Sequence, residues 1–494
     1  MPYWTSLRSS ALFRTSLAAA SLAALLATGC KGVVVNGGAY GEGGSGDPGG
    51  SSSSAFGDWH VGWALSWPTT LGDRAIGRLG PTGATVGGYF SGAITFPDNQ
   101  LDVGGDTAGY VVRVGKDGQI AWTQLITNPA GLVDVVAVDC DAQGRSLVGG
   151  DFMYDFTIDG QSFSAPGKAG GFVALLDTDG SLLWARMFTA QDGADVKGAR
   201  FAPDGSVIVA GEYIGGMELD GAVLPSFDGV KDYTTGDVYF AKLSAEDGSR
   251  VWARGYGGTG FDSVDSLEIQ TNGDLLASGQ YNDAIDFGTG PLAAASTQGY
   301  GYVARVSGVD GAPLFARPLG FAYGTVAAAP DGSYYFSGVL DKAADMGSGP
   351  ITSPALDMVV TAYGANDEPL WTKQYGDASV NFVANAYVGA SSGGLAAAWG
   401  VDGSVDFGDG MTTAKGAEDM FITAFPADGS PPRTMVYGSP QNETPYMFTL
   451  GSDNSALIVG NVSGTLDFSP ADHGTGIVTG DEGGNTFLLY LVPN

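Results

Sequence analysis

The stretch VKGARFAPDGSVIVAGEY, residues 196–213, holds two runs of strand-forming residues on either side of the turn Pro-Asp-Gly at 203–205. After a polar loop come DVYFAKLS (237–244) and RVWARGY (250–256), which are separated by a second turn containing Asp and Gly. Short runs rich in Val, Ile, Tyr, Phe and Trp, with Gly-containing turns between them, are typical of β-strands. No segment of this unit keeps a helical period, so we expect four short antiparallel strands.

The same unit recurs along the chain with a period near 62 residues. One marker of the period is a glycine inside a strand-like segment, at Gly88, Gly150, Gly211, Gly279, Gly338, Gly400 and Gly460. A second marker is an aromatic residue in the last strand, at Trp63, Trp122, Trp184, Trp252, Phe315 and Trp371, with Arg433 in the corresponding place. Two markers with one period predict a repeat fold, and four-strand units at this spacing are the signature of β-propeller blades.

The repeats also resemble those of seven-bladed β-propellers in bacterial surface lipoproteins of the glycine-rich type. The resemblance is carried by the segment IDFG and its variants, followed by strands such as GGFVALLDTDG and LLWARMF, with the aspartates at Asp286, Asp345, Asp406 and Asp467. It covers about residues 60–494. It implies an all-β, seven-bladed propeller with four-stranded antiparallel blades, and it implies no particular activity, because such repeats are scaffolds.

The segment HVGWALSWPTTLGD (60–73) is only half a unit, placed before the series begins. The last unit ends with NTFLLYLVPN (485–494), a third strand with no fourth strand after it. We therefore expect residues 61–67 to supply the outer strand of the seventh blade and so to close the ring. This pairing would satisfy two strand edges that are otherwise open.

The N-terminus has the pattern of an export signal. Arg8 and Arg14 precede a short apolar run that ends in LLATGC, whereas a membrane-spanning helix needs about 20 apolar residues. The ending resembles a bacterial lipobox, which implies cleavage before Cys30 and a lipid, including palmitate, on that residue. Secretion without a lipid is the alternative.

Three segments follow from this interpretation: a signal peptide at 1–29, a Gly/Ser-rich tether at 30–57, and the propeller at 58–494. Lys31, rather than Asp, follows the acylated cysteine. By resemblance to sorted lipoproteins, this implies the outer membrane or cell surface of a Gram-negative-type bacterium. The membrane is then a partner only through the lipid anchor.

The chain is strongly acidic, with a formal net charge of −31 at pH 7. Removal of residues 1–29 takes away two arginines and no acid, so 20 basic and 53 acidic residues leave about −33. Such a surface repels nucleic acid, which we exclude as a partner. With Cys30 acylated, Cys140 has no disulfide partner, and its apolar strand pattern predicts a buried side chain. We expect a monomer.

Four aspartates are candidates for a site at the mouth of the central channel. Counting back ten residues from the first-turn glycine gives Asp73, Asp134 and Asp195 in consecutive units, and Asp262 lies one place off this register. These positions begin the innermost strand, on the face where the long loops gather. They predict either a site for Ca²⁺ or a cationic ligand, or loop acids that complete turns, and we favour the turns.

Other motifs predict structure rather than chemistry. DCDAQG (139–144) imitates a calcium loop, but Gly144 aligns with ordinary turn glycines, so we interpret it as a hairpin. His60 and His473 are the only histidines, too few for a zinc site of the usual ligands or a Ser–His–Asp relay. The recurring G-x-x-x-W resembles the tryptophan-docking repeats of pyrroloquinoline-quinone propellers. We expect these tryptophans to be structural, and we expect no cofactor except, as an alternative, Ca²⁺.

We therefore predict a noncatalytic binding or adhesion scaffold at the cell surface, with an unknown glycan or protein as ligand and no catalytic residue. The first alternative is a glycan-active enzyme that uses carboxylates alone, with Asp195 or Asp262 at the channel mouth. The second alternative is a structural module stabilised by Ca²⁺.

Overall fold

The structure, a computed structural model, describes residues 35–36, 56–68, 75–96, 99–128, 132–227, 236–293, 300–376, 382–468, 477–480 and 484–494. Every regular element in these residues is a β-strand, so the all-β prediction is confirmed. In this part of the chain, no helix has the length and apolar character that crossing a membrane requires. The predicted signal peptide, Cys30, most of the tether, Asp73 and His473 lie outside the described residues.

The segment 196–256 forms the four strands expected from its sequence. They pair antiparallel in chain order and are β12 (Gly198–Phe201), β13 (Val207–Ile214), β16 (Asp237–Leu243) and β17 (Arg250–Thr259). Two short strand pairs accompany this meander. In one, β11 (Gly193–Ala194) pairs with β13, and in the other β14 (Met217–Leu219) pairs with β15 (Ala222–Leu224).

The strands before this meander repeat its pattern. They are β3 (Ala75–Gly80), β4 (Gly83–Thr95), β5 (Gln100–Gly115) and β6 (Ile120–Thr127), then β7 (Val133–Cys140), β8 (Ser146–Ile158), β9 (Gln161–Leu176) and β10 (Leu182–Phe188). Within each group, consecutive strands pair antiparallel. β6 also pairs briefly with β8, which joins the two groups into one sheet.

The strands after it continue the series. They are β18 (Ser266–Ile269), β19 (Leu275–Tyr281), β20 (Ala284–Asp286), β21 (Leu292–Ala293), β22 (Tyr300–Val306), β23 (Pro313–Ala328), β24 (Tyr334–Asp345), β25 (Pro350–Tyr363) and β26 (Pro369–Tyr375). β23 serves two meanders, because its first half pairs with β22 and its second half with β24. The remaining strands up to Leu450 are β27 (Phe382–Ser391), β28 (Gly394–Asp402), β29 (Ser404–Asp406), β30 (Met411–Thr413), β31 (Asp419–Pro426), β32 (Arg433–Tyr437) and β33 (Glu443–Leu450).

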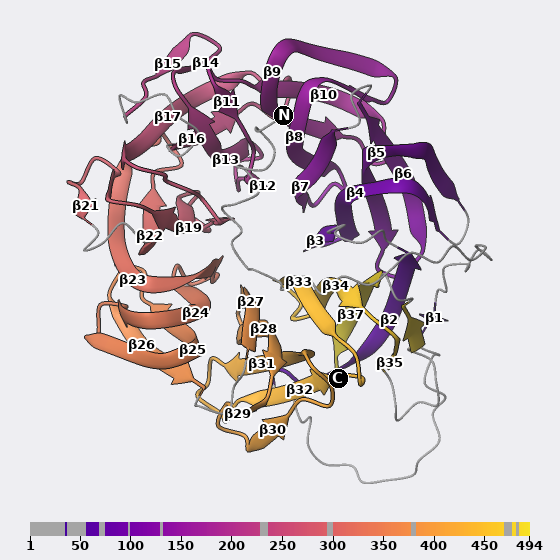
Figure 1. Cartoon of the computed structure of the whole chain (residues 1–494), viewed down its shortest axis with the longest axis vertical. Coiled ribbons are helices and arrows are strands. Elements are labelled where there is room, and N and C mark those ends of the chain that lie inside the picture. Colours follow the sequence, from indigo (N-terminus) through magenta and orange to yellow (C-terminus); the bar gives the residue numbers. More distant parts are fainter. Residues whose placement is uncertain are drawn as a thin grey trace, which may run out of the picture.

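The meanders follow one another around a central space, with β3, β7, β12, β27 and β33 nearest to it (Figure 1). This is the arrangement of a β-propeller. Neighbouring sheets pack through buried apolar side chains: Leu147 and Val173 of one sheet share a core with Val207 and Tyr239 of the next. Since burial of such a side chain contributes about 1.5–3 kcal/mol, these cores supply much of the stability.

The two ends of the chain meet in one sheet. β2 (Trp59–Pro68) pairs antiparallel with β37 (Asn485–Pro493), in register from Trp59 opposite Pro493 to Pro68 opposite Asn485. β37 pairs in turn with β34 (Ala456–Val462), and β34 with β33. This is the pairing that the sequence predicts for 61–67 and 485–494. The same region holds β1 (Val35–Asn36), β35 (Thr465–Asp467) and β36 (Ile477–Thr479).

The recurring strand glycine is explained by a close approach of two backbones. A Cβ atom on Gly211 would lie 2.1 Å from the carbonyl oxygen of Asp195, at the start of the innermost strand. Equivalent approaches, all of 2.5 Å or less, occur at Gly150 to Asp134 O, Gly279 to Ser263 O, Gly338 to Tyr323 O and Gly460 to Thr444 O. Any larger residue would push the innermost strand away, so only glycine fits.

The recurring tryptophan joins one meander to the next. Trp184 donates its indole N–H to Ala245 O at 3.0 Å, and its ring lies on Gly248 of the following meander. The same two contacts link Trp63 with Lys116 O and Gly118, Trp122 with Thr178 O and Gly180, and Trp252 with Gly308 O and Gly311. In the two other positions a cation lies over the ring, namely Arg317 over Phe315 and Lys373 over Trp371. A cross-sheet packing role thus accounts for Trp63, Trp122, Trp184 and Trp252.

The aspartate of the IDFG segment also has a structural role. Asp286 Oδ1 accepts hydrogen bonds from the N–H groups of Gly288 and Gly290, at 2.6 and 3.1 Å. The same pattern occurs at Asp345 with Gly347 and Gly349, and at Asp406 with Gly408 and Gly410. These carboxylates complete a turn, which explains their recurrence.

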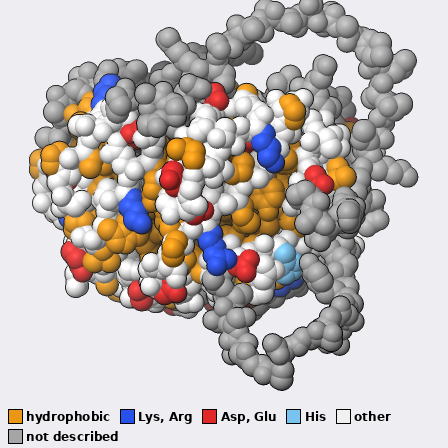
Figure 2. Space-filling model, turned by 90° about the horizontal axis from the view of Figure 1, so that it is seen from below, with side chains coloured by type: hydrophobic (Ala, Val, Ile, Leu, Met, Phe, Trp, Pro, Cys, Tyr) orange, Lys and Arg blue, Asp and Glu red, His pale blue; other side chains and the backbone are white. Residues whose placement is uncertain are grey.

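Four of the outer strands expose a large apolar side chain directly before the marker aromatic. Leu183, Val251, Leu314 and Leu370 each precede a marker aromatic and are between 45% and 57% exposed. Because side chains alternate across a strand, the aromatic turns inward and its neighbour outward. Seen from the side, hydrophobic side chains lie among polar ones on the outer wall (Figure 2).

Removal of β2 tests the junction of the two chain ends. Deletion of residues 58–68 takes Trp63, Leu65 and Trp67 out of a shared core and leaves the edge of β37 open. We expect the midpoint of thermal unfolding to fall by about 10 °C or more. Deletion of 37–55, outside the described residues, is the control and should leave the midpoint unchanged. Equal midpoints for the two deletions would contradict the pairing.

Replacement of one marker glycine tests the close approach. Gly211→Ala should lower the free energy of unfolding by about 1–3 kcal/mol, the usual range for overpacking, because the new methyl group meets Asp195 O. Gly216→Ala is the matched control, since the nearest atom to its Cβ would be 4.0 Å away. Urea unfolding measures both variants, and a neutral Gly211→Ala would refute the explanation.

Candidate functional site

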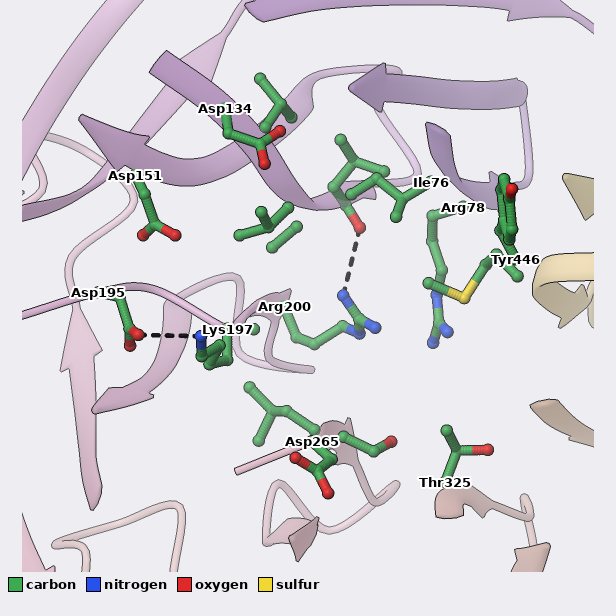
Figure 3. A pocket seen from close by; sticks show the side chains of 18 of the residues that line it. Ile76, Arg78, Asp134, Asp151, Asp195, Lys197, Arg200, Asp265, Thr325 and Tyr446 are labelled. Carbon is green, nitrogen blue, oxygen red and sulfur yellow. Dashed lines mark hydrogen bonds and ion pairs between the residues drawn. The ribbon is translucent and has the colours of Figure 1, made fainter. Parts of the chain in front are cut away.

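A cavity of about 550 Å³ lies where the innermost strands face one another. Its lining comes from β3, β7, β12, β18, β23, β27 and β33, together with parts of β4, β8, β9 and β11. We call it the axial cavity, and Figure 3 shows part of its lining. A volume of this size is typical of sites for small organic ligands, which occupy about 300–1,000 Å³.

Charge is distributed unevenly around the axial cavity. All charged lining residues come from the arc between β3 and β18, and they are Arg78, Asp134, Asp151, Asp195, Lys197, Arg200, Asp265 and Glu268. The arc formed by β23, β27 and β33 contributes only uncharged residues, namely Thr325, Val326, Tyr387, Val388, Tyr446, Met447 and Phe448. The cavity therefore has one charged wall and one largely apolar and aromatic wall.

The two arginines of the charged wall, Arg78 and Arg200, already form ion pairs with carboxylates. Arg78 donates to both oxygens of Glu268, at 2.7 and 2.5 Å, and lies 3.7 Å from Asp139. Arg200 lies 3.5 Å from Glu268 and donates to Val138 O. Burial alone would lower the pKa of Arg78, but Glu268 and Asp139 outweigh burial and raise that pKa above its usual value. Two guanidinium groups thus face two carboxylates.

The other charged group is dominated by acids. We call Asp134, Asp151, Asp195, Glu212 and Asp265 the acidic cluster, and Lys197 is its one cation among the described residues. Glu212, on β13, does not line the cavity but lies behind Asp195 and Lys197. The Lys197 ammonium is 2.9 Å from Asp195 Oδ2 and 4.0 Å from Glu212 Oε2. Figure 3 shows the pairing of Lys197 with Asp195.

Crowding of like charges disturbs the titration of this cluster. Burial, and then the charge of Asp195, raise the pKa of Asp151 well above its usual range, although Lys197 acts in the opposite direction. Burial likewise raises the pKa of Glu212, with Asp195 and Asp265 adding to the effect of burial and Lys197 opposing it. Both carboxyl groups hold protons more tightly than ordinary acids do. Perturbed carboxyl groups that border a cavity are candidates for a functional site.

The predicted aspartates separate in the structure. Asp134 and Asp195 line the axial cavity, and Asp195 is only 3% exposed. Asp262 is fully buried, does not line the cavity, and accepts a hydrogen bond from Gly258 N at 2.9 Å. In the unit that contains Asp262, the backbone carbonyl that approaches the marker glycine Gly279 belongs to Ser263. In the preceding unit, the corresponding carbonyl, which approaches Gly211, belongs to Asp195. Because Asp262 is one residue out of register, its side chain does not reach the axial cavity that Asp134 and Asp195 line.

The sequence contained a further signal that our count of ten residues missed. Counting back five residues from the same turn glycines gives Arg78, Asp139, Arg200 and Glu268, which alternate in charge from one unit to the next. The innermost strands bring these four together around the cavity. Lys197, Glu212 and Asp151 carry no comparable periodic signal, because each occurs at its position in one or two units only.

The remaining predicted motifs occupy structural positions. Asp141 accepts hydrogen bonds from Gln143 N and Arg145 N, while Asp139 accepts from Phe201 N, so DCDAQG is a hairpin whose acids have different partners. Among the residues that the structure describes, no three His, Cys, Asp or Glu side chains are placed to hold a metal ion. Cys140 is buried, and burial raises the pKa of its thiol to about 11.

A second group of acids lies where β31 approaches β33, away from the axial cavity. Asp419 and Glu443 are both fully buried, and Ser439 donates its hydroxyl to Glu443 Oε1 at 2.6 Å. Burial, with the neighbouring Asp419, raises the pKa of Glu443 to about 7. Burial also raises the pKa of Glu418 to about 7. These acids, whose pKa values are raised, lie at the junction of the two sheets that contain β31 and β33.

Comparisons with known proteins were made for the whole chain. No family model and no curated protein matches it. Among solved structures it is similar to the quinohemoprotein alcohol dehydrogenase ADHIIG of Pseudomonas putida HK5, with 10% identity, a TM-score of 0.40, and 90% of this chain and 77% of that chain covered. It is also similar to the Dos1 propeller, with 10% identity, a TM-score of 0.39, and 89% and 96% covered.

A third similar structure is the acylaminoacyl peptidase of Pyrococcus horikoshii, with 10% identity, a TM-score of 0.40, and 81% of this chain and 51% of that chain covered. At such TM-scores these likenesses carry no argument for an activity, a cofactor or a ligand. The β-propeller arrangement is based on the strand pairings of this chain.

The acids between β31 and β33 predict a pH-dependent stability. Because the pKa of Glu443 is raised from 4.5 to about 7, its contribution is complete below its usual pKa and is lost as pH rises through about 7. The midpoint of thermal unfolding should therefore fall between about pH 5 and about pH 8, and Glu443→Gln should fall less steeply. Glu246→Gln, an exposed turn residue, should keep the wild-type slope. Parallel slopes for wild type and Glu443→Gln would contradict this origin.

Proposed function

We propose that this chain is an exported, lipid-anchored, seven-bladed β-propeller that binds a ligand in its axial cavity without catalysis. The observation that carries the binding function is the cavity itself: polar groups from several innermost strands converge on one volume of about 550 Å³. The innermost strands β3, β7 and β12 are each paired with the second strand of their meander, and neighbouring meanders pack through shared cores, which makes the site rigid. Rigid, preformed concave sites of this kind are typical of small-ligand binding.

The blade number and the closed ring belong to this proposal. They are supported by the repeat of seven marker glycines and by the pairing of β2 with β37. In this arrangement β33, β34, β37 and β2 form the seventh blade. Trp63 then occupies the same position as the other marker tryptophans, because it contacts the turn of the following meander in the same way.

Export and anchoring rest on the N-terminal sequence alone. The apolar run ending in Cys30 supports a lipidated N-terminus, and Lys31 supports the outer membrane or cell surface of a Gram-negative-type bacterium. The Gly/Ser composition of the segment after Cys30 supports a tether of the kind that lets a folded domain stand away from a membrane. A monomer at the surface, binding a glycan, a small molecule or part of a protein, fits these features.

A carboxylate-dependent, glycan-active enzyme is the second candidate. It is favoured by one observation, which is that burial, and then the charge of Asp195, raise the pKa of Asp151 beside the cavity. Glycosidases use a pair of carboxyl groups, one of which has a raised pKa. Asp262, the other residue considered for this role, does not line the cavity. A Ca²⁺-stabilised module has no such supporting geometry among the described residues.

A cavity-filling variant tests the binding function. Residues 30–494 with Cys30→Ala would be screened against soluble glycans and small molecules by thermal shift and calorimetry. Val136→Trp fills the axial cavity without removing a charge, because Val136 lines it, and we expect this variant to lose at least about 90% of any binding found. Val251→Trp, on the exposed outer wall, is the control and should bind normally.

Two outcomes would contradict the proposal. Binding that Val136→Trp leaves intact would place the ligand outside the axial cavity. Turnover of a polysaccharide that is abolished by Asp151→Asn would replace the noncatalytic function with the enzymatic one.

A further inference from the structure

The acidic cluster contains more negative charge than its one cation can balance. Five carboxyl groups gather around Lys197, whose ammonium has one close partner, Asp195 Oδ2 at 2.9 Å. Glu212 Oε2 is at 4.0 Å, beyond hydrogen-bond distance. Like charges held close together repel one another, so a second cation or protons would stabilise the cluster.

One oxygen of the Glu212 carboxylate, Oε2, shows that the negative charge is poorly balanced. The residue is 3% exposed, and its Oε1 accepts a long hydrogen bond from Val264 N at 3.3 Å. Its Oε2 has no hydrogen-bond partner among the described residues. A buried carboxylate oxygen without a donor is costly, and in a native structure such an atom calls for an explanation, for example a bound water, ion or ligand. The unsatisfied oxygen lies 4.0 Å from the Lys197 ammonium, behind the lining of the axial cavity.

The shape of the site favours an organic ligand over a metal ion. No three acids among the described residues are arranged as metal ligands, whereas the cavity measures about 550 Å³. Opposite the charged arc, β23, β27 and β33 present only uncharged side chains, including Tyr387, Val388 and Phe448. A ligand that fills the cavity would thus have a charged end and an apolar or aromatic body.

An organic anion is the rival ligand, and the charge pairing disfavours it. Arg200 Nε has no acceptor among the described residues, but both arginines already face Glu268 and Asp139. An anion would have to compete with these carboxylates. A cation placed next to Asp151 and Asp195 would meet no such competitor except Lys197.

We propose that the axial cavity binds an organic cation, with an ammonium group beside Asp151 and Asp195, in front of Glu212, and an apolar body against β23, β27 and β33. This inference rests on the proposed function, in which the axial cavity is the ligand site. The groups that face the ammonium are Asp134 on β7, Asp151 on β8, Asp195 and Lys197 before β12, Glu212 on β13, Tyr239 on β16 and Asp265 before β18. The ammonium takes the place of a proton held by the cluster, so binding releases protons.

Three probes of one shape and different charge test the inference by titration calorimetry on residues 30–494 with Cys30→Ala. They are phenethylamine, neutral 2-phenylethanol and anionic phenylacetate. We expect phenethylamine to bind at least about tenfold more tightly than the other two. Titrations near neutral pH in buffers of different ionisation enthalpy should show protons released by phenethylamine only.

Variants locate the charge. Asp151→Asn should weaken phenethylamine binding by about tenfold and reduce the proton release. Asp265→Asn, whose carboxyl group is exposed to the cavity, is a second variant in case Asp151→Asn does not fold. Asp428→Asn changes the net charge equally on an exposed turn and should leave both quantities unchanged. Circular dichroism and thermal unfolding report whether each variant is folded.

Several results would overturn the inference. They are equal or tighter binding of 2-phenylethanol or phenylacetate, no binding of phenethylamine, or binding that neither Asp151→Asn nor Asp265→Asn weakens. If a neutral or anionic probe binds and Val136→Trp abolishes that binding, the proposed cavity function stands and only the cationic ligand class fails. If phenethylamine binds equally well to Val136→Trp, both proposals fail.

Discussion

The approach of an innermost strand to a marker glycine, seen in five units, is the constraint on which the rest of the structure depends. The carbonyl oxygen at the start of the innermost strand lies where a Cβ atom of the second strand would be, as between Asp195 and Gly211. This contact sets the register of the first two strands in a meander. It is followed by a bulge, for example between Val135 and Ala137 in β7, which turns the next side chains toward the axis. The lining of the cavity is a consequence of this local geometry.

The equal register of successive meanders also organises charge. Arg78, Asp139, Arg200 and Glu268 occupy the same position in consecutive units, so their alternating charges meet between neighbouring innermost strands and also between β3 and β18, in the pair Arg78–Glu268. These four side chains therefore pair with one another and carry no net charge. The acidic cluster, which includes Asp151, Asp195 and Glu212, lacks such alternation and keeps an excess of acid. This excess of acid is what makes the cluster a candidate site.

Much of the fold was predictable because its causes are local and repeated. Glycine at a close approach, tryptophan on the turn of the next meander, and aspartate bridging two glycine amides each recur at one period. The candidate site was only partly predictable. Asp134 and Asp195 follow the period and line the cavity, but Asp262, one residue out of step, is buried elsewhere. Lys197 and Glu212 are visible only once the strands are placed side by side.

The sequence by itself determined the strands and their order, because strand propensity and turn glycines act over short distances along the chain. It also determined the pairing of β2 with β37, because each of these strands has an open edge that needs another strand as its partner. The tertiary structure decided which acids share a volume. Asp151, Asp195 and Asp265 come from three successive units, and their mutual repulsion depends on a separation that no spacing along the chain expresses. Electrostatic energy depends on distance in space and on burial, and both exist only after the meanders have packed around the axis.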